Sequence, residues 1–285
     1  MKVTTLKSEN KGKNALILGG IHGDEKSGSI AIKKFINDIQ TETISILSGS
    51  VTLISNCNEK AGIENRRYLE NNLNRCFYEG QNLQSYEGDI ARKIMPFFNE
   101  TNYLLDIHST SGPSIPFLFS ENRNIEIAKN LGVSHVVLGW NDLGSVSISG
   151  DTENYMNNKG GYGFTFEAGN HDNSEGPNNA YKVLLNFLSN LGIINSNLFS
   201  KLSKEKSLIQ MSSVYVCKFG NFEFKLGKNE LENFSFIKSG TLIGIDGIEK
   251  IYAEKDMILV MPNLANPKKG EDVFFVGEKI KIKNL

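Results

Sequence analysis

The sequence lacks the cysteine pairs, signal segment and long apolar runs that mark secreted and membrane proteins. Its three cysteines, Cys57, Cys76 and Cys217, are far apart and form no C-x-x-C pair, which argues against a disulfide framework or a thiolate zinc site. The N-terminal stretch MKVTTLKSENKGKN has no apolar core of signal-peptide length, and no uncharged apolar run approaches the roughly 20 residues of a membrane span. We therefore expect a cytoplasmic protein with reduced thiols and no membrane partner.

The sequence also lacks a strong net charge. Its 31 Lys+Arg and 32 Asp+Glu residues give a formal charge of -1, so no basic field favours nucleic acid as a partner. The 39% hydrophobic and 22% charged residues are ordinary for a globular protein, and 285 residues suffice for a large domain with or without a small one. This size sets no obstacle to an enzyme, and the sequence gives no indication of the oligomeric state.

The first 200 residues alternate short apolar runs with amphipathic segments. ALILGG, from residue 15, is typical of a strand buried on both faces, and the isoleucines and Phe35 of residues 26–40 are spaced as on one face of a helix. Further strands are expected at 51–56 and 103–109 and in PFLFS, HVVLG and GFTFEAG, and further helices at about 86–99, 124–131 and 177–192. The alternation predicts an α/β domain over residues 1–200, with a mixed or mostly parallel sheet flanked by helices.

The pattern changes beyond a polar segment near residues 196–207. From SSVYVCKFG onwards, short β-rich runs are separated by Gly, Asn and Pro, with no convincing helix. We therefore expect a smaller all-β domain over residues 201–285.

Two histidines follow predicted strands. GGIHGDE, at 19–25, places His22 and Glu25 three residues apart where a strand turns into a helix, and LLDIHST, at 104–110, ends a strand in His108. A His, Glu, His set leaves the fourth zinc position open for water, which is the catalytic pattern. Asp106 faces the same side of its strand as His108 and could orient that imidazole. An ordinary polar turn at 22–25, and an Asp106 paired with a nearby helix, are the alternatives.

Two more segments carry candidate catalytic groups. Glu167, in GFTFEAG, ends an apolar strand, where a carboxylate is costly unless it is paired or used to move a proton. ENRRYLENNLNRCF, at 64–77, contains arginines that could bind a carboxylate or polarise a carbonyl. A structural salt bridge for Glu167 and a solvated basic loop for residues 64–77 remain possible from these residues alone.

Together, GGIHGDE, NRRYLENNLNRCF, DIHS and FEAG, in that order, resemble the succinylglutamate desuccinylase/aspartoacylase family, relatives of the zinc carboxypeptidases. The C-terminal LVMPNLANPKKGE is also similar to that family, so the resemblance covers most of the chain. It implies a zinc-carboxypeptidase-like fold and an amidohydrolase with one zinc ion per chain.

The resemblance also implies a role for each matching residue. Zinc would be held by His22, Glu25 and His108. Glu167 would be general base and acid, and Arg67, which precedes Tyr68, would polarise the carbonyl, with Arg66 as an extra arginine. Asn74 and Arg75, in NLNR, would hold a substrate carboxylate.

These roles predict hydrolysis of an N-acyl amino acid or a related small amide. A carboxypeptidase acting on a peptide or cell-wall fragment, and a non-catalytic metal- or ligand-binding protein, are the alternatives. Relatives that act on acidic acyl groups resemble one another in having a further arginine, but this chain has none after Arg123, and Lys159 would lack the fork geometry of an arginine. Of the other histidines, His135 is expected to be structural, and His171 either lines the pocket or lies in a loop without a catalytic role.

Overall fold

A computed structural model describes residues 1–143, 150–195 and 206–281. Its main sheet has 11 strands in the order β1-β3-β2-β4-β7-β5-β6-β8-β14-β13-β10. The four strands that position the candidate site are mutually parallel: β3 (Ser50–Ile54), β2 (Asn14–Gly19), β4 (Tyr103–Thr110) and β7 (Tyr162–Asn170). At their sides, β1 (Val3–Lys7) runs antiparallel to β3, and β5 (Phe117–Phe119) runs antiparallel to β7. The next strand, β6 (His135–Leu138), is parallel to β5. The sheet is therefore mixed, as expected.

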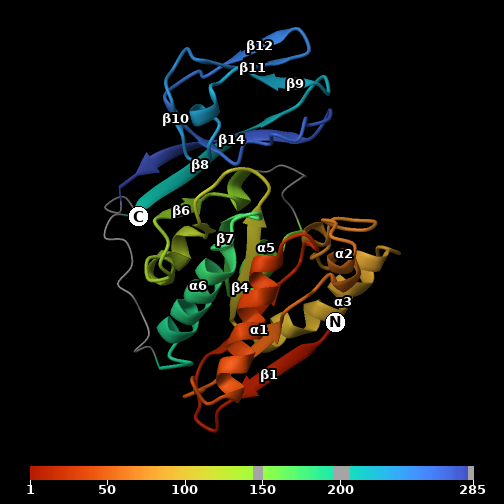
Figure 1. The fold of residues 1–285 in the computed structure, drawn as a ribbon, viewed down its shortest axis with the longest axis vertical. Coiled ribbons are helices and arrows are strands. Elements are labelled where there is room, and N and C mark those ends of the chain that lie inside the picture. The colour runs from red at the N-terminus through yellow and green to blue at the C-terminus, as the bar shows by residue number, and fades with distance from the viewer. Residues whose placement is uncertain (144–149, 196–205, 282–285) are drawn as a thin grey trace.

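Helices cover both faces of this sheet because its central strands are apolar on both sides. Along β2, Ala15 and Ile17 pack into one core and Leu16 and Leu18 into another. The first core includes α1 (Lys26–Gln40), α4 (Ile125–Ala128) and α6 (Gly176–Asn190), and the second includes α3 (Tyr86–Glu100) and α5 (Thr152–Asn158). Figure 1 shows α1 and α6 side by side. This arrangement confirms the predicted α/β class.

Some short elements differ from the expectations. The helix expected at 124–131 is limited to α4, because a turn follows it and Gly132 has a φ of 103°. It is preceded by the 3₁₀ turn η2 (Asn122–Asn124). The strand β1, the helix α5 and the short helix α2 (Glu59–Ile63) were not predicted. Further 3₁₀ turns are η1 (Leu73–Arg75), η3 (Asn141–Leu143) and η4 (Lys228–Glu230).

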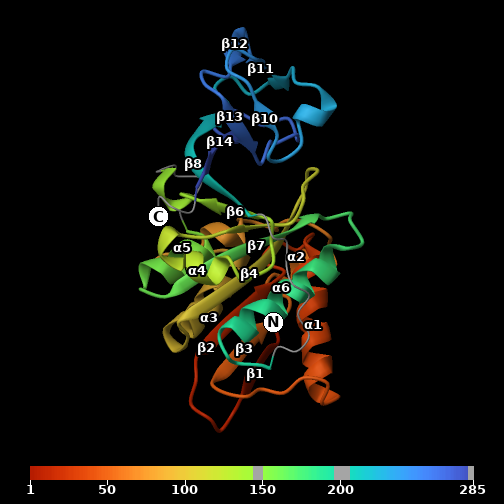
Figure 2. The ribbon, with the colours of Figure 1, turned by 90° about the vertical axis from the view of Figure 1, so that its left-hand side faces the viewer.

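The C-terminal part is β-rich, and its strands continue the main sheet. β8 (Ser207–Val216) pairs in parallel with β6 and antiparallel with β14 (Asp272–Ile280), followed by β13 (Met257–Val260) and β10 (Phe236–Ile237). A separate three-stranded sheet contains β12 (Glu249–Tyr252), β11 (Leu242–Asp246) and β9 (Phe222–Phe224). Figure 2 shows β8 and β14 leading from the α/β part to these strands. The expected domain boundary at residue 200 lies outside the described residues.

Among the described residues, no helix is both long enough and apolar enough to cross a bilayer.

Candidate functional site

The topology brings the predicted site residues to one edge of the sheet. His22 lies in the turn after β2, and Glu25 is the residue before α1. His108 lies near the end of the adjacent strand β4, and the β4–β7 register places Glu167 opposite it. Because β2, β4 and β7 are parallel, their carboxyl ends meet, which is where open α/β sheets bind ligands.

The two imidazoles and the Glu25 carboxylate turn their donor atoms toward one another. His22 Nδ1 lies 2.8 Å from Glu25 Oε1, His108 Nδ1 lies 2.9 Å from Glu25 Oε2, and the two Nδ1 atoms are 3.2 Å apart. Zinc bonds of about 2.0 to 2.2 Å in a tetrahedron place neighbouring ligand atoms roughly 3.3 Å apart. The three buried residues could therefore hold a metal ion, and their donor set is that of a catalytic zinc site.

The charges of this cluster also suit a cation. Burial lowers the pKa of His22 to about 4, against the attraction of Glu25, so its imidazole is neutral near pH 7. Burial opposes ionisation of Glu25, but the adjacent imidazoles of His22 and His108 hold its pKa well below the usual range. His108 is also buried, yet Asp106 and Glu25 keep its pKa well above normal. A metal ion would replace the proton on His108 and compensate the Glu25 charge.

Outer contacts orient both imidazoles. His22 Nε2 lies 3.0 Å from Asn72 Oδ1, which fixes Nδ1 as the atom that faces the cluster. His108 Nε2 lies 2.9 Å from Asp106 Oδ2, although its N–H is not aimed well enough for a hydrogen bond. The side chain of Asp106 thus lies where the sequence pattern placed it.

Asn72 is a contact that the sequence analysis missed. Its Oδ1 also accepts a hydrogen bond from the Asn74 backbone N–H at 3.0 Å, as an N-cap of η1. The one available signal was an asparagine two residues before Asn74, a spacing typical of such caps. That signal predicts a turn but does not predict the contact with His22.

Glu167 is a buried carboxylate beside the cluster. The residue is 7% exposed, and its Oε2 has no hydrogen-bond partner among the described residues. Burial, reinforced by the negative charge of Glu25, raises the pKa of Glu167 to about 7. A group with this pKa can both take and return a proton at neutral pH.

The two adjacent arginines have different positions. Arg67 Nη1 donates to Glu25 Oε1 at 2.8 Å, although the arginine side chain is 46% exposed. Arg66 instead pairs with Glu64 at the surface, at 3.2 Å. The structure therefore brings Arg67 to the cluster and leaves Arg66 outside it.

Asn74 and Arg75 lie on η1, beside the same site. Asn74 Oδ1 accepts a hydrogen bond from the Thr152 backbone N–H at 3.1 Å, and Arg75 Nη1 donates to the Asn74 carbonyl at 2.6 Å. Burial lowers the pKa of Arg75, while the charges of Asp151 and Asp272 favour its guanidinium. Because Asp272 begins β14, this guanidinium lies where the α/β part meets the C-terminal strands.

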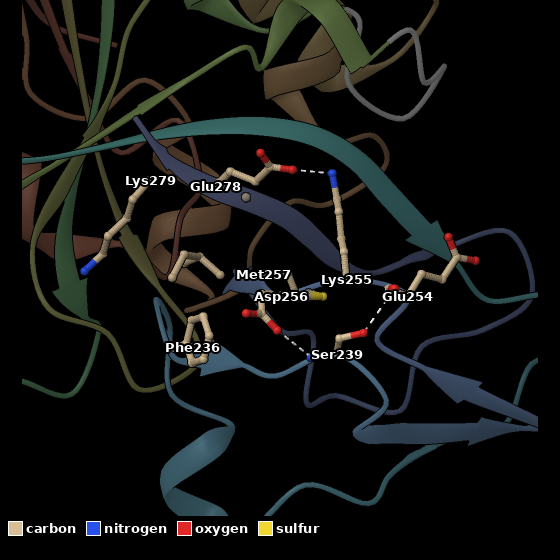
Figure 3. A pocket seen from close by; sticks show the side chains of 10 residues that line it. Phe236, Ser239, Glu254, Lys255, Asp256, Met257, Glu278 and Lys279 are labelled. Atoms are coloured by element: carbon tan, nitrogen blue, oxygen red, sulfur yellow. Dashed lines mark hydrogen bonds and ion pairs between the residues drawn. The ribbon is translucent and has the colours of Figure 1, made fainter. Parts of the chain in front are cut away.

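A groove lies among the C-terminal strands, far along the chain from the cluster of His22, Glu25 and His108. This groove of about 640 Å³ is drawn in Figure 3. Several of its polar groups bond to one another: Lys255 pairs with Glu278, and the Ser239 backbone N–H donates to Asp256 at 2.8 Å. Its lining includes no histidine or cysteine. We therefore assign the candidate site to the cluster around Glu25.

Residues 11–189, more than half of the chain, match the family profile described as the succinylglutamate desuccinylase/aspartoacylase catalytic domain. The chain belongs to this family. A succinylglutamate desuccinylase of Vibrio campbellii is 27% identical over 269 residues, 88% of this chain and 76% of that one. A probable aspartoacylase of Acaryochloris marina is 34% identical over 110 residues, 35% of each chain. Membership of the desuccinylase/aspartoacylase family supports a hydrolase that removes an acyl group.

Solved structures of the desuccinylase/aspartoacylase family share the fold. The crystal structure of succinylglutamate desuccinylase from Vibrio cholerae superimposes with a TM-score of 0.80 at 20% identity, covering 98% of this chain and 86% of that one. The similarity therefore includes the C-terminal strands as well as the α/β part.

Within the described residues, Arg123 and Lys159 are both engaged away from the cluster. Arg123 Nη2 donates to the Gly161 carbonyl at 2.6 Å, and Lys159 pairs with Glu79 at 3.1 Å. His171 contacts Ser109 Oγ at 2.9 Å, one residue from the cluster, whereas the partly buried His135 stacks on Phe234. Lys159 is thus engaged away from the cluster. Of these two histidines, His171 lies closer to the cluster, through its contact with Ser109.

Proposed function

We propose that the chain is a zinc-dependent deacylase that hydrolyses the amide bond of an N-acyl amino acid. The observation that carries the proposal is the convergence of His22, Glu25 and His108 beside the buried carboxylate of Glu167. Zinc in this site would supply a Lewis acid that lowers the pKa of water toward about 7 and polarises a carbonyl. A cytoplasmic location and one zinc ion per chain are part of the proposal.

Glu167 is the proposed general base and acid. With a pKa of about 7, it can accept the proton of the attacking water and donate it to the departing amine. Its Oε2 makes no hydrogen bond within the described residues, and we therefore assign this atom as the one that accepts the proton of the water.

Arg67 is the proposed oxyanion-stabilising residue. Its exposed side chain reaches the cluster from the solvent side and donates to Glu25. A guanidinium in this position can bind the carbonyl oxygen of an amide as that oxygen gains negative charge, an effect often worth about 10² to 10³ in rate.

Asn74 and Arg75 are proposed to hold the carboxylate of the amino-acid half. Arg75 supplies the positive charge, and its bond to the Asn74 carbonyl fixes one side of the guanidinium. Because Arg123 and Lys159 are engaged elsewhere, we propose that the preferred acyl half carries no charge.

The test is amine release from a panel of N-acyl amino acids, combined with metal analysis of the purified protein. We expect one zinc per chain, turnover of substrates with a neutral acyl group, and weaker turnover of N-succinyl substrates. Short peptides form a second panel, and a preference for them would indicate a carboxypeptidase instead. Absence of amine release by the zinc-loaded protein on both panels would refute the proposal, while Glu167→Gln should keep zinc and lose turnover.

A further inference from the structure

A second buried carboxylate, Glu87, lies behind the loop that carries the candidate catalytic arginine. Glu87 is in the first turn of α3 and is fully buried. Its Oε1 accepts hydrogen bonds from the Leu69 backbone N–H at 2.8 Å and from Asn58 Nδ2 at 3.2 Å. Its Oε2 accepts from the backbone N–H groups of Glu70 at 3.2 Å and Asn71 at 3.1 Å. Four donors thus occupy the roughly four acceptor positions of the carboxylate.

The loop held in this way has little secondary structure of its own. Residues 64–72 connect α2 to η1 without a helix or strand. The three consecutive N–H groups that Glu87 accepts would otherwise be unsatisfied, and their bonds outweigh the effect of burial and lower the pKa of Glu87. Glu70, in the loop, makes the reciprocal hydrogen bond, because its Oε2 accepts the backbone N–H of Tyr86, the first residue of α3, at 2.8 Å. The loop and the helix start are thus bonded in both directions.

The clamped segment lies between two residues of the candidate site. On one side, Arg67 donates to Glu25, and its carbonyl accepts the Gly23 N–H at 3.1 Å. On the other side, Asn72 contacts His22 Nε2. Asn58, the fourth donor to Glu87, also donates its backbone N–H to the Gly20 carbonyl at 2.8 Å, next to the turn that carries His22.

We propose that Glu87 is a positioning residue, which acts on the reaction through Arg67 and on the metal through Asn72. The effect of Glu87 through Arg67 rests on the proposed deacylase function. Its effect through Asn72 on metal binding can be measured without turnover. Glu87 itself touches neither cluster nor substrate. Its effect follows from fixing residues 69–71, because a displacement of about 1 Å in a catalytic group can cost roughly 10²-fold in rate.

The test is a double-mutant cycle with Glu87→Gln and Arg67→Ala. The glutamine keeps one acceptor oxygen but turns its NH₂ group toward N–H donors, so about two of the four bonds are lost. We expect kcat to fall about tenfold or more in the wild-type background, with less than about a twofold further loss in the Arg67→Ala background. Equal losses in both backgrounds would overturn the positioning role.

Zinc affinity, measured by competition with a chromogenic chelator, is the readout that does not need activity. Outer partners of metal-bound histidines typically contribute about 10- to 100-fold in affinity, so Glu87→Gln should weaken zinc binding in the wild type but add little in an Asn72→Ala background. If the wild type releases no amine while this pattern holds, the deacylase function fails and the positioning role stands. If the wild type releases amine and Glu87→Gln changes neither kcat nor zinc affinity, the deacylase function stands and the positioning role of Glu87 fails.

Asp246, the last residue of β11, offers a matched control, and Figure 1 shows β11 far from α3. It is also a fully buried carboxylate that accepts two consecutive backbone N–H groups, from Lys218 at 2.7 Å and Phe219 at 3.1 Å. Asp246→Asn should lower the melting temperature but leave kcat and zinc affinity within about twofold of wild type, as for independent sites. Should Glu87→Gln fail to fold, Glu87→Asp, which keeps the charge but is one methylene shorter, enters the same cycles with the same expected pattern.

Discussion

The buried carboxylate of Glu167 makes the stability of the metal-free protein depend on pH in a specific way. The folded protein keeps the Glu167 proton up to a pH of about 7, whereas an unfolded glutamate releases it near 4.5. Between these values the folded state binds more protons, so this contribution to stability is present below pH 4.5 and is lost as the pH rises through 7. At about 1.4 kcal/mol per pKa unit, the whole contribution is about 3 kcal/mol.

Glu167→Gln removes this titration and keeps the size of the side chain. The free energy of unfolding of the chelator-treated variant, minus that of chelator-treated wild type, should therefore increase by about 2.5 kcal/mol between pH 5 and pH 8. Groups remote from Glu167 titrate equally in both proteins and cancel in this difference.

Urea unfolding at the two pH values measures the difference. Zinc should shrink the Glu167→Gln difference, because a nearby cation favours the ionised carboxylate. A difference that stays the same at both pH values without metal would refute the assignment of Glu167 as a buried, proton-holding group.

Three further predictions concern the same site. Arg67→Ala should lower kcat by about 10² to 10³ with unchanged zinc content, as measured by steady-state kinetics and metal analysis. Gly23→Ala should destabilise the protein by about 1 to 3 kcal/mol in urea unfolding, because the new Cβ would lie 2.2 Å from the Ala61 backbone carbon; an unchanged midpoint would contradict this packing. Free zinc at 100 times its Kd should stabilise the protein by about 2.7 kcal/mol in thermal unfolding, and Glu25→Gln should abolish this gain.

The sequence was most informative where a local pattern coincides with the topology. The apolar runs of β2, β4 and β7 each end near a candidate site residue, and parallel strands bring their carboxyl ends together. The placement of His22, His108 and Glu167 at one edge could therefore be predicted without knowing the register. The sheet class followed from the same alternation of strands and helices.

The contacts behind the site could not be predicted in this way. Asn72 and Glu87 act through a loop whose shape depends on hydrogen bonds between residues that are far apart in sequence, such as Glu87 with Leu69 and Asn72 with His22. No periodicity encodes such a loop. The strand β1 was missed for a related reason, since VTTLK is a polar edge strand and its pairing with β3 is long-range.

The pairing of β6 with β8 has a consequence for any shortened version of the chain. β8 satisfies the outer backbone groups of β6 from His135 to Leu138, and its Ile209 and Met211 cover Val137 in a shared core. A chain cut before residue 206 would expose unpaired amides and apolar side chains together, the combination that promotes self-association and aggregation. The C-terminal strands are for this reason not a detachable appendage, and a catalytic fragment made without them should be recovered as an insoluble or oligomeric product.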